Sequence, residues 1–130
     1  MTQTIEAIYA YSNANLRDGA DDYSAQGALE FWSSGGLLQE IPPDSRTGTY
    51  DAISIHPKHI RVTPLVEGEA AVAHYYLEGS MTPQGGTPVG HYLTRVSQVF
   101  VREDGAWKVR ASHWSPITGG AGTSQTALDQ

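Results

Sequence analysis

The sequence predicts a single α+β domain in which a curved antiparallel sheet wraps around N-terminal helices. Two patterns predict this fold. Apolar residues recur at helical spacing only in the first third of the chain, and from residue 59 onward apolar and polar residues alternate as in strands joined by turns. Helices followed by an antiparallel meander are typical of α+β folds. Because 130 residues are enough for one domain, we expect residues 1–130 to form it, with residues 118–130 as an extended tail.

The N-terminal third is expected to contain two helices. Residues 5–16 place apolar side chains on one helical face, with Thr4 as the N-cap and an end at residues 18–19. A second helix is expected to begin at residue 21 or 22 and to run to Trp32, because the apolar residues at 25, 28, 29 and 32 also share a helical face. The Ser-Ser-Gly-Gly sequence that follows would end it.

The rest of the chain is expected to be mostly strand. Residues 37–41 are too short for a helix and end at two prolines, so they predict a strand. Residues 44–48 predict a turn, and residues 50–55 are either a short helix or extended, with a break at His56-Pro57. The expected meander consists of strands 59–66, 70–81, 91–102 and 106–114.

The composition excludes several classes of function. The chain has no cysteine, which excludes disulfides, thiolate metal sites and cysteine nucleophiles. A net charge of −6 argues against nucleic-acid binding, and no apolar run is long enough to span a membrane. We expect a cytoplasmic protein that needs no metal and no cofactor. Two histidines, His56 and His59, could be half of a metal site, but no third ligand lies at a suitable spacing.

Alternation along the last two expected strands suggests a polar site on their odd-numbered face. A three-residue turn at 103–105 would place Arg95 opposite His113 on the inner face, whereas a two-residue turn would place Val96 there. An arginine beside a histidine suits a carboxylate or another anionic group of a ligand. Alternatively, His113 bonds to the backbone and Arg95 pairs with a structural carboxylate.

The chain resembles a known superfamily in two stretches. Residues 104–109 (Asp-Gly-Ala-Trp-Lys-Val) and 113–115 (His-Trp-Ser) resemble the ending of SnoaL-like proteins and of the association domain of calcium/calmodulin-dependent kinase II. Residues 28–32, 37–40 and 46–49 are similar to the helix–strand–arginine layout of ketosteroid isomerase. The resemblance implies the cone-shaped α+β barrel of the nuclear transport factor 2-like superfamily, built around one pocket.

The resemblance also implies site residues. Glu40 stands about where ketosteroid isomerases hold their general base, and Tyr9 or Tyr11 could supply the oxyanion tyrosine. Ser97 stands where those enzymes have a protonated aspartate, so this chain departs from their oxyanion site. The candidate catalytic residues are Glu40 and His113, and the candidates for substrate binding are Arg95, Ser97, Tyr11 and Trp32.

Two functions remain open at this stage. One is a cofactor-independent isomerase, dehydratase or cyclase acting on a small organic molecule, for which a carboxylate group is one option; the other is a non-catalytic ligand-binding or oligomerisation domain. A homodimer is expected through the outer face of the sheet, where Tyr92, Val96, Phe100 and Trp114 would gather, with the tail helping to fasten it. The roles of His56, His59, His74 and His91 are left open.

Overall fold

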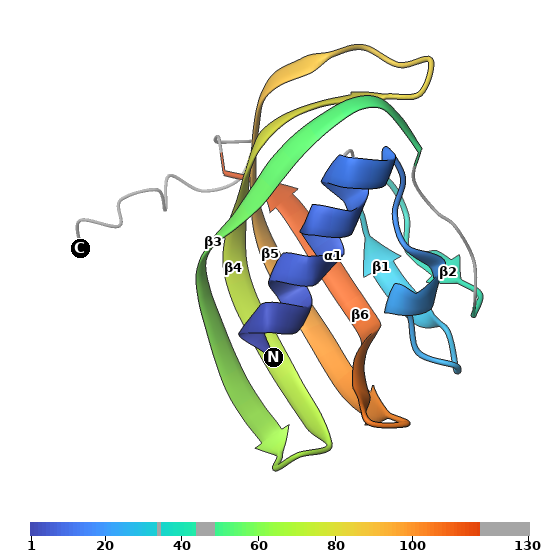
Figure 1. Cartoon of the computed structure of the whole chain (residues 1–130), viewed down its shortest axis with the longest axis vertical. Coiled ribbons are helices and arrows are strands. Elements are labelled where there is room, and N and C mark those ends of the chain that lie inside the picture. Colours follow the sequence, from blue (N-terminus) through green and yellow to red (C-terminus); the bar gives the residue numbers. More distant parts are fainter. Residues whose placement is uncertain (34, 44–48, 118–130) are drawn as a thin grey trace.

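A computed structural model describes residues 1–33, 35–43 and 49–117 of the chain. Within these residues, one α-helix and one short 3-10 helix precede six strands (Figure 1). The elements are α1 (Thr2–Asn15), η1 (Ala20–Asp22), β1 (Ala28–Phe31), β2 (Gln39–Ile41), β3 (Tyr50–Val66), β4 (Ala70–Pro83), β5 (Val89–Glu103) and β6 (Ala106–Pro116).

The six strands form one mixed sheet in the order β2-β1-β6-β5-β4-β3. All neighbours are antiparallel except β1 and β6, which run parallel. The sheet curves around α1, which crosses its concave side (Figure 1). Strands β2 and β3 are its two edges, so it does not close into a barrel. The predicted α+β class and wrapped sheet are confirmed, although the sheet is not wholly antiparallel.

Helix α1 docks through a stripe of residues spaced four and three apart. Ile5, Tyr9 and Ser12 are buried against the sheet. Thr4 lies inside the helix rather than at its cap, and the helix ends at Leu16, which has φ 57° and donates its N–H to the carbonyl of Ser12. The first predicted helix is therefore confirmed, with an earlier start and end.

The second predicted helix is wrong, since only η1 and β1 occupy that segment. Gly27 has φ 82°, and a Cβ there would lie 2.7 Å from the carbonyl oxygen of Ile41. This close approach admits only glycine and turns the chain into β1. Along β1 the side chains alternate between buried and exposed, as in a strand. The apolar spacing that suggested a helix arose from two short elements placed end to end.

Strand β3 continues through His56-Pro57, where a break was expected. Because β3 is an edge strand, a proline can sit in it without removing a hydrogen bond from the sheet interior. The irregularity comes just after, between Lys58 and Arg61, where His59 has φ 55°. The strand predicted at 37–41 and the four-stranded meander are otherwise confirmed.

The β5–β6 hairpin has a two-residue turn, not the expected three-residue turn. Arg102 pairs with Trp107, and both Asp104 and Gly105 have positive φ, as a tight hairpin requires. A bulge then shifts the pairing after Phe100 by one residue. As a result Ser97, and neither Arg95 nor Val96, lies opposite His113.

The concave side carries the core of the domain. It collects apolar side chains from α1 and from all six described strands around the fully buried Phe100. The main contributors are Ile5, Tyr9, Ile41, Ile55, Tyr75, Leu77, Val96, Phe100 and Val109. In the described part of the chain, no helix is both long and apolar enough to cross a membrane. The predicted role of the tail concerns residues 118–130, which lie outside the described residues.

Candidate functional site

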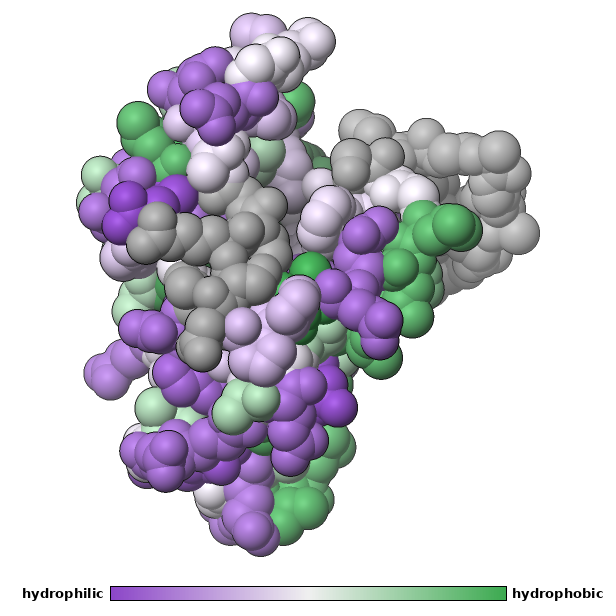
Figure 2. Space-filling view, turned by 90° about the vertical axis from the view of Figure 1, so that its right-hand side faces the viewer, coloured by the Kyte–Doolittle hydropathy of each residue, from purple (hydrophilic) through white to green (hydrophobic). Residues whose placement is uncertain are grey.

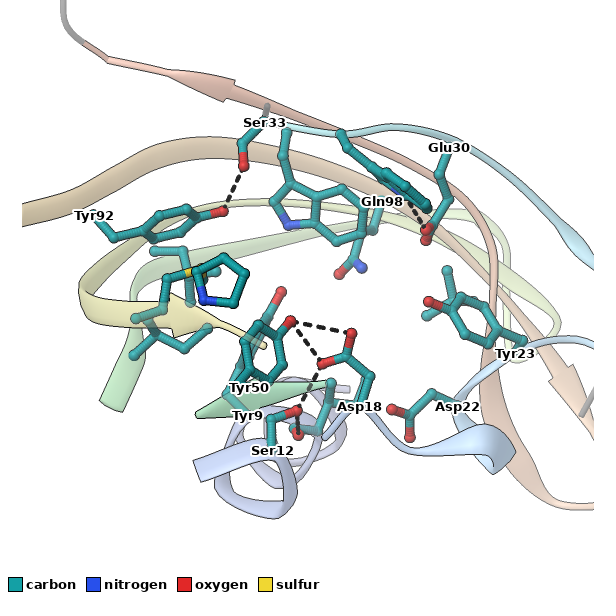
Figure 3. Close-up of a pocket in the computed structure, with 18 residues that line it drawn as sticks. Tyr9, Ser12, Asp18, Asp22, Tyr23, Glu30, Ser33, Tyr50, Tyr92 and Gln98 are labelled. Carbon is teal, nitrogen blue, oxygen red and sulfur yellow. Dashed lines mark hydrogen bonds between the residues drawn. The ribbon is translucent and has the colours of Figure 1, made fainter. Parts of the chain in front are cut away.

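A cavity of about 290 Å³ lies between α1 and the concave face of the sheet. Aliphatic side chains and six tyrosine or tryptophan rings line it, together with three acidic residues. The acids are Asp18, Asp22 and Glu30. Figure 3 shows the Asp18 and Asp22 carboxyls on one side of this space and the Glu30 carboxyl on the other, with the Gln98 amide between them.

Glu30 is the most deeply buried of the three acids. Its side chain is 1% exposed because β1 turns it to the concave face. Trp32 Nε1 donates to Glu30 Oε1 over 3.1 Å, and Oε2 is buried without a hydrogen-bond partner among the described residues. Burial raises the pKa of Glu30, and the nearby donors of Trp32 and Ser112 only partly offset this. The carboxyl can therefore hold a proton at a higher pH than an exposed glutamate.

Asp18 follows the end of α1 and is held by hydroxyl groups. Tyr50 donates its hydroxyl to both carboxylate oxygens at 3.2 Å, and Ser12 donates to Oδ1 at the same distance. Burial, then the adjacent Asp18 charge, raises the pKa of Tyr50 well above its usual range. Tyr50 thus remains a neutral donor that positions the Asp18 carboxylate.

Asp22 ends η1 and is partly buried. Burial, followed by the negative charge of Asp18, raises the pKa of Asp22 to about 6, although Lys108 acts in the opposite direction. A carboxyl with this pKa is largely ionised at neutral pH and still basic enough to accept a proton. Asp18 and Asp22 are both placed by the short turn after α1, which the left-handed Leu16 begins.

A chain of buried hydrogen bonds runs along the floor of the cavity. The hydroxyls of Tyr9 and Tyr75 are 2.6 Å apart, and Tyr75 donates to Gln98 Oε1 over 2.6 Å. Gln98 Nε2 in turn donates to Ser112 over 3.1 Å. Burial raises the pKa values of Tyr9 and Tyr75 well above their usual range, so both phenols stay neutral. Every member is paired, which fixes the orientation of the Gln98 amide.

Four of the residues expected at the site lie elsewhere. Glu40, Arg95, Ser97 and His113 are exposed and do not line the cavity. Glu40 pairs with the outward-facing Leu29, and the hairpin turn and bulge of β5–β6 put the other three on the convex face. The expectation that Glu40, Arg95 and His113 converge on one cavity is therefore wrong.

The other two substrate-binding candidates differ from each other. Trp32 lines the cavity beside Glu30, and its role in binding remains a prediction. Tyr11 faces a separate surface groove, where Arg17 donates to its hydroxyl over 3.1 Å. Of the two tyrosines considered for an oxyanion site, only Tyr9 reaches the cavity.

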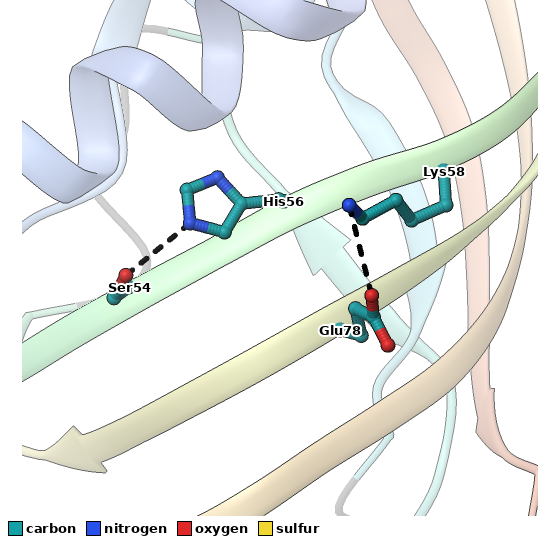
Figure 4. Close-up of polar contacts among 4 residues, drawn as sticks. All are labelled: Ser54, His56, Lys58 and Glu78. Carbon is teal, nitrogen blue, oxygen red and sulfur yellow. Dashed lines mark hydrogen bonds and ion pairs between the residues drawn. The ribbon is translucent and has the colours of Figure 1, made fainter.

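All five histidines are exposed, and none lines the cavity. On β3, Ser54 Oγ lies 3.3 Å from His56 Nε2, and nearby Lys58 forms a 3.7 Å ion pair with Glu78 of β4 (Figure 4). His59 instead packs edge-on against Tyr76. Within the residues that the structure describes, no three acidic or histidine side chains are grouped to hold a metal.

The three cavity acids were missed because each lay in a segment assigned to something else. Asp18 lies at the predicted end of the first helix, Asp22 at the predicted start of the second, and Glu30 inside that second helix. Had residues 28–31 been interpreted as a strand, Glu30 would have stood out as a candidate. In a strand it shares the inward face with Ala28, while the apolar residues on either side of it face outward. A charged residue on the small-residue face of a short strand is expensive to bury and suggests a site.

Comparisons with known proteins identify the fold. The SnoaL-like domain family matches residues 5–119. A protein from Novosphingobium aromaticivorans, proposed to be an aromatic ring hydroxylase, has a TM-score of 0.66 at 17% identity over 97% of this chain and 93% of its own. A nuclear transport factor 2-like superfamily protein from Salmonella enterica serovar Typhimurium has a TM-score of 0.57 at 21% identity over 95% and 93%.

The association domain of calcium/calmodulin-dependent kinase II from C. elegans has a TM-score of 0.51 at 16% identity and covers 88% of both chains. At these identities the likeness concerns the fold alone. Curated proteins give no match. The family match covers most of the chain and agrees with the curved sheet around a cavity, so this protein belongs to the SnoaL-like domain family.

Proposed function

We propose that this protein is a small cofactor-independent enzyme that transfers a proton on an organic substrate held in the cavity. Isomerase, dehydratase and cyclase reactions all include such a step. The observation that carries the proposal is the Glu30 carboxyl, which is buried in the cavity wall with one oxygen unpaired among the described residues. Carboxyls with raised pKa values in enclosed pockets are common among catalytic acids and bases.

The acids can take complementary roles. Asp22, with a pKa of about 6, is the better base at neutral pH, and Glu30, whose pKa burial raises, is the better proton donor. Asp18 is held by Tyr50 and Ser12, which suits it to positioning and to shaping the charge of the site. The neutral Gln98 amide lies between the acids and can bind a substrate carbonyl (Figure 3).

Deuterium exchange at carbon tests this proposal before the natural substrate is known. The protein is incubated in D₂O with a panel of small ketones, and incorporation next to the carbonyl is followed by NMR. We expect catalysed exchange, lowered at least about 100-fold in Glu30→Gln and in Asp22→Asn. Asp104→Asn removes one negative charge at the exposed hairpin tip and should leave exchange unchanged. Exchange that persists in both cavity variants would contradict the proposal.

An assembly role is the second candidate, and the solved association domains favour it. An expected mark of a purely structural domain is a cone plugged by side chains, whereas here the space contains three acids. Assembly and catalysis are compatible, and we propose a homodimer through the convex face. Tyr92, Val96, Phe100 and Trp114 cannot form its interface as first expected, because they lie on the concave side. Exposed Leu29, Phe31 and Tyr76 take their place.

A further inference from the structure

The charge of the cavity is one-sided. Among the described side chains that line it, three are acidic and none is lysine, arginine or histidine. The two acids with raised pKa values, Asp22 and Glu30, both owe part of the rise to the charge of Asp18, in addition to burial. The three carboxyls therefore interact through the same space, and an anion placed between them would be repelled.

The basic side chains close to the cavity donate hydrogen bonds to backbone carbonyls rather than to the cavity acids. Lys108 donates to the carbonyl of Asp21 over 2.5 Å and lines the neighbouring surface groove rather than the cavity. Arg110 donates to the carbonyl of Gly27 over 3.0 Å. Lys108 lowers the pKa of Asp22 but does not cancel the rise from burial and Asp18. The negative potential of the cavity is therefore left for a ligand to balance.

The aromatic walls of the cavity are also suited to a positively charged ligand. Six of its lining side chains are tyrosine or tryptophan, contributed by α1, β3, β5, β6 and the segments beside β1. Aromatic rings attract cations through their electron-rich faces, and groups of such rings bind quaternary ammonium ions in other proteins. The hydroxyls of three of these rings are already hydrogen-bonded, Tyr9 to Tyr75, Tyr50 to Asp18 and Tyr92 to Ser33. This leaves the rings themselves as the contact surface.

We propose that the cavity binds an organic cation, so that the substrate of this enzyme carries an amine or quaternary ammonium group. The proposal rests on the proposed function in taking the cavity as the substrate site. The ammonium group lies between the acids and the rings, with the carboxylates of Asp18 and Asp22 as its main charged partners. A carboxylate-bearing ligand, which the sequence suggested through Arg95, does not fit, because Arg95 is on the convex face.

Two probes of equal shape separate charge from size. Choline carries a trimethylammonium group, and 3,3-dimethylbutan-1-ol replaces its nitrogen by carbon. Each is titrated into the whole protein at pH 7.5, with binding followed by NMR and by tryptophan fluorescence. We expect choline to bind at least about fivefold more tightly than the alcohol. Asp18→Asn and Asp22→Asn should each reduce this preference, while Asp104→Asn removes the same charge outside the cavity and should preserve it.

Each outcome of this experiment either supports or overturns the binding of a cation in the cavity. Equal or weaker binding of choline, or no binding of either probe at up to about 10 mM, overturns the inference. A preference for choline that both cavity variants retain also overturns it, because the ammonium group would then bind at a site outside the cavity. If only one variant folds, as judged by its thermal unfolding, that variant decides. Ketone exchange that depends on Glu30 without any choline preference leaves the proposed function standing, whereas a choline preference without exchange removes only the catalysis.

Discussion

The hydroxyls of Tyr9 and Tyr75 lie 2.6 Å apart and join α1 to strand β4 inside the core, although 66 residues separate them in the chain. Their rings also meet edge to face, with centroids 5.9 Å apart. Because Tyr75 also donates a hydrogen bond to Gln98, the two tyrosines anchor both helix α1 and the Gln98 amide on the cavity floor.

Replacing Tyr75 with phenylalanine is therefore expected to destabilise the protein. The change leaves the Tyr9 hydroxyl and Gln98 Oε1 without this partner in a buried place, at a cost of about 1–3 kcal/mol. Tyr76→Phe is the matched control, because the side chain of Tyr76, the next residue, is exposed. This change should alter stability by less than about 0.5 kcal/mol. Urea unfolding measures both, and equal stabilities would show that the buried chain contributes nothing.

The sequence predicts an element well when one hydrophobic period runs along its whole length, and poorly when two short elements follow each other. The meander from β3 to β6 was predictable, because long alternating runs and turn residues agree over four strands. Helix α1 was predictable for the same reason. Residues 21–32 were not, because η1 and β1 are each too short to show a period, and a close contact between Gly27 and Ile41 decides the turn.

Two features of the β5–β6 hairpin separate Arg95 and His113 from the cavity: the two-residue turn puts Arg95 on the convex face, and one extra residue in β6 puts His113 there. With a two-residue turn and a regular ladder, Val96 would face His113, but the bulge beyond Phe100 moves Ser97 there. The bulge also turns Ser112 and Trp114 inward and His113 outward. Local sequence shows no sign of it, since β6 has the same strand-forming composition on both sides. The polar residues Gln98 and Thr94 on the buried face further disguised which side of β5 is inside.

A second prediction concerns Asp22 and pH. Its pKa rises from 3.8 to about 6 on folding, so between these values the unfolded chain releases the proton while the folded protein keeps it. Asp22 therefore lowers the free energy of unfolding as pH rises from about 4 to about 6, and the loss is complete above that range. Asp22→Asn should gain stability relative to the wild type over this interval. Urea unfolding at several pH values tests this, and parallel curves for the two proteins would contradict it.

A third prediction concerns the contact between α1 and the edge strand. Asn13 Nδ2 donates to the carbonyl of Ile55 over 2.9 Å, and Asn13 Oδ1 accepts from the N–H of Ile55 over 3.0 Å. Asn13→Ala leaves both backbone groups of an edge strand without this partner and should cost about 1–3 kcal/mol. Asn15→Ala removes only an exposed bond to Tyr11 and should change stability by less than about 0.5 kcal/mol. Comparable losses in the two variants would mean that the contact does not hold the helix.

The last prediction tests the proposed homodimer. Several exposed apolar side chains belong to the β1–β2 side of the molecule, which faces the viewer in Figure 2. One of them, Phe31, is 42% exposed and packs against His113 of the neighbouring strand, with ring centroids 5.3 Å apart. Such residues on a broad sheet face are typical of association surfaces.

We expect light scattering at micromolar concentration to give about twice the chain mass of 14.0 kDa. Phe31→Glu should shift the protein towards the monomer, because a buried unpaired charge is costly in an interface. Leu65→Glu, at an exposed position near the end of β3, adds the same charge on the far edge of the sheet and should leave the dimer intact. A monomeric wild type would remove the dimer altogether, and a dimer that survives Phe31→Glu would place its interface on another surface.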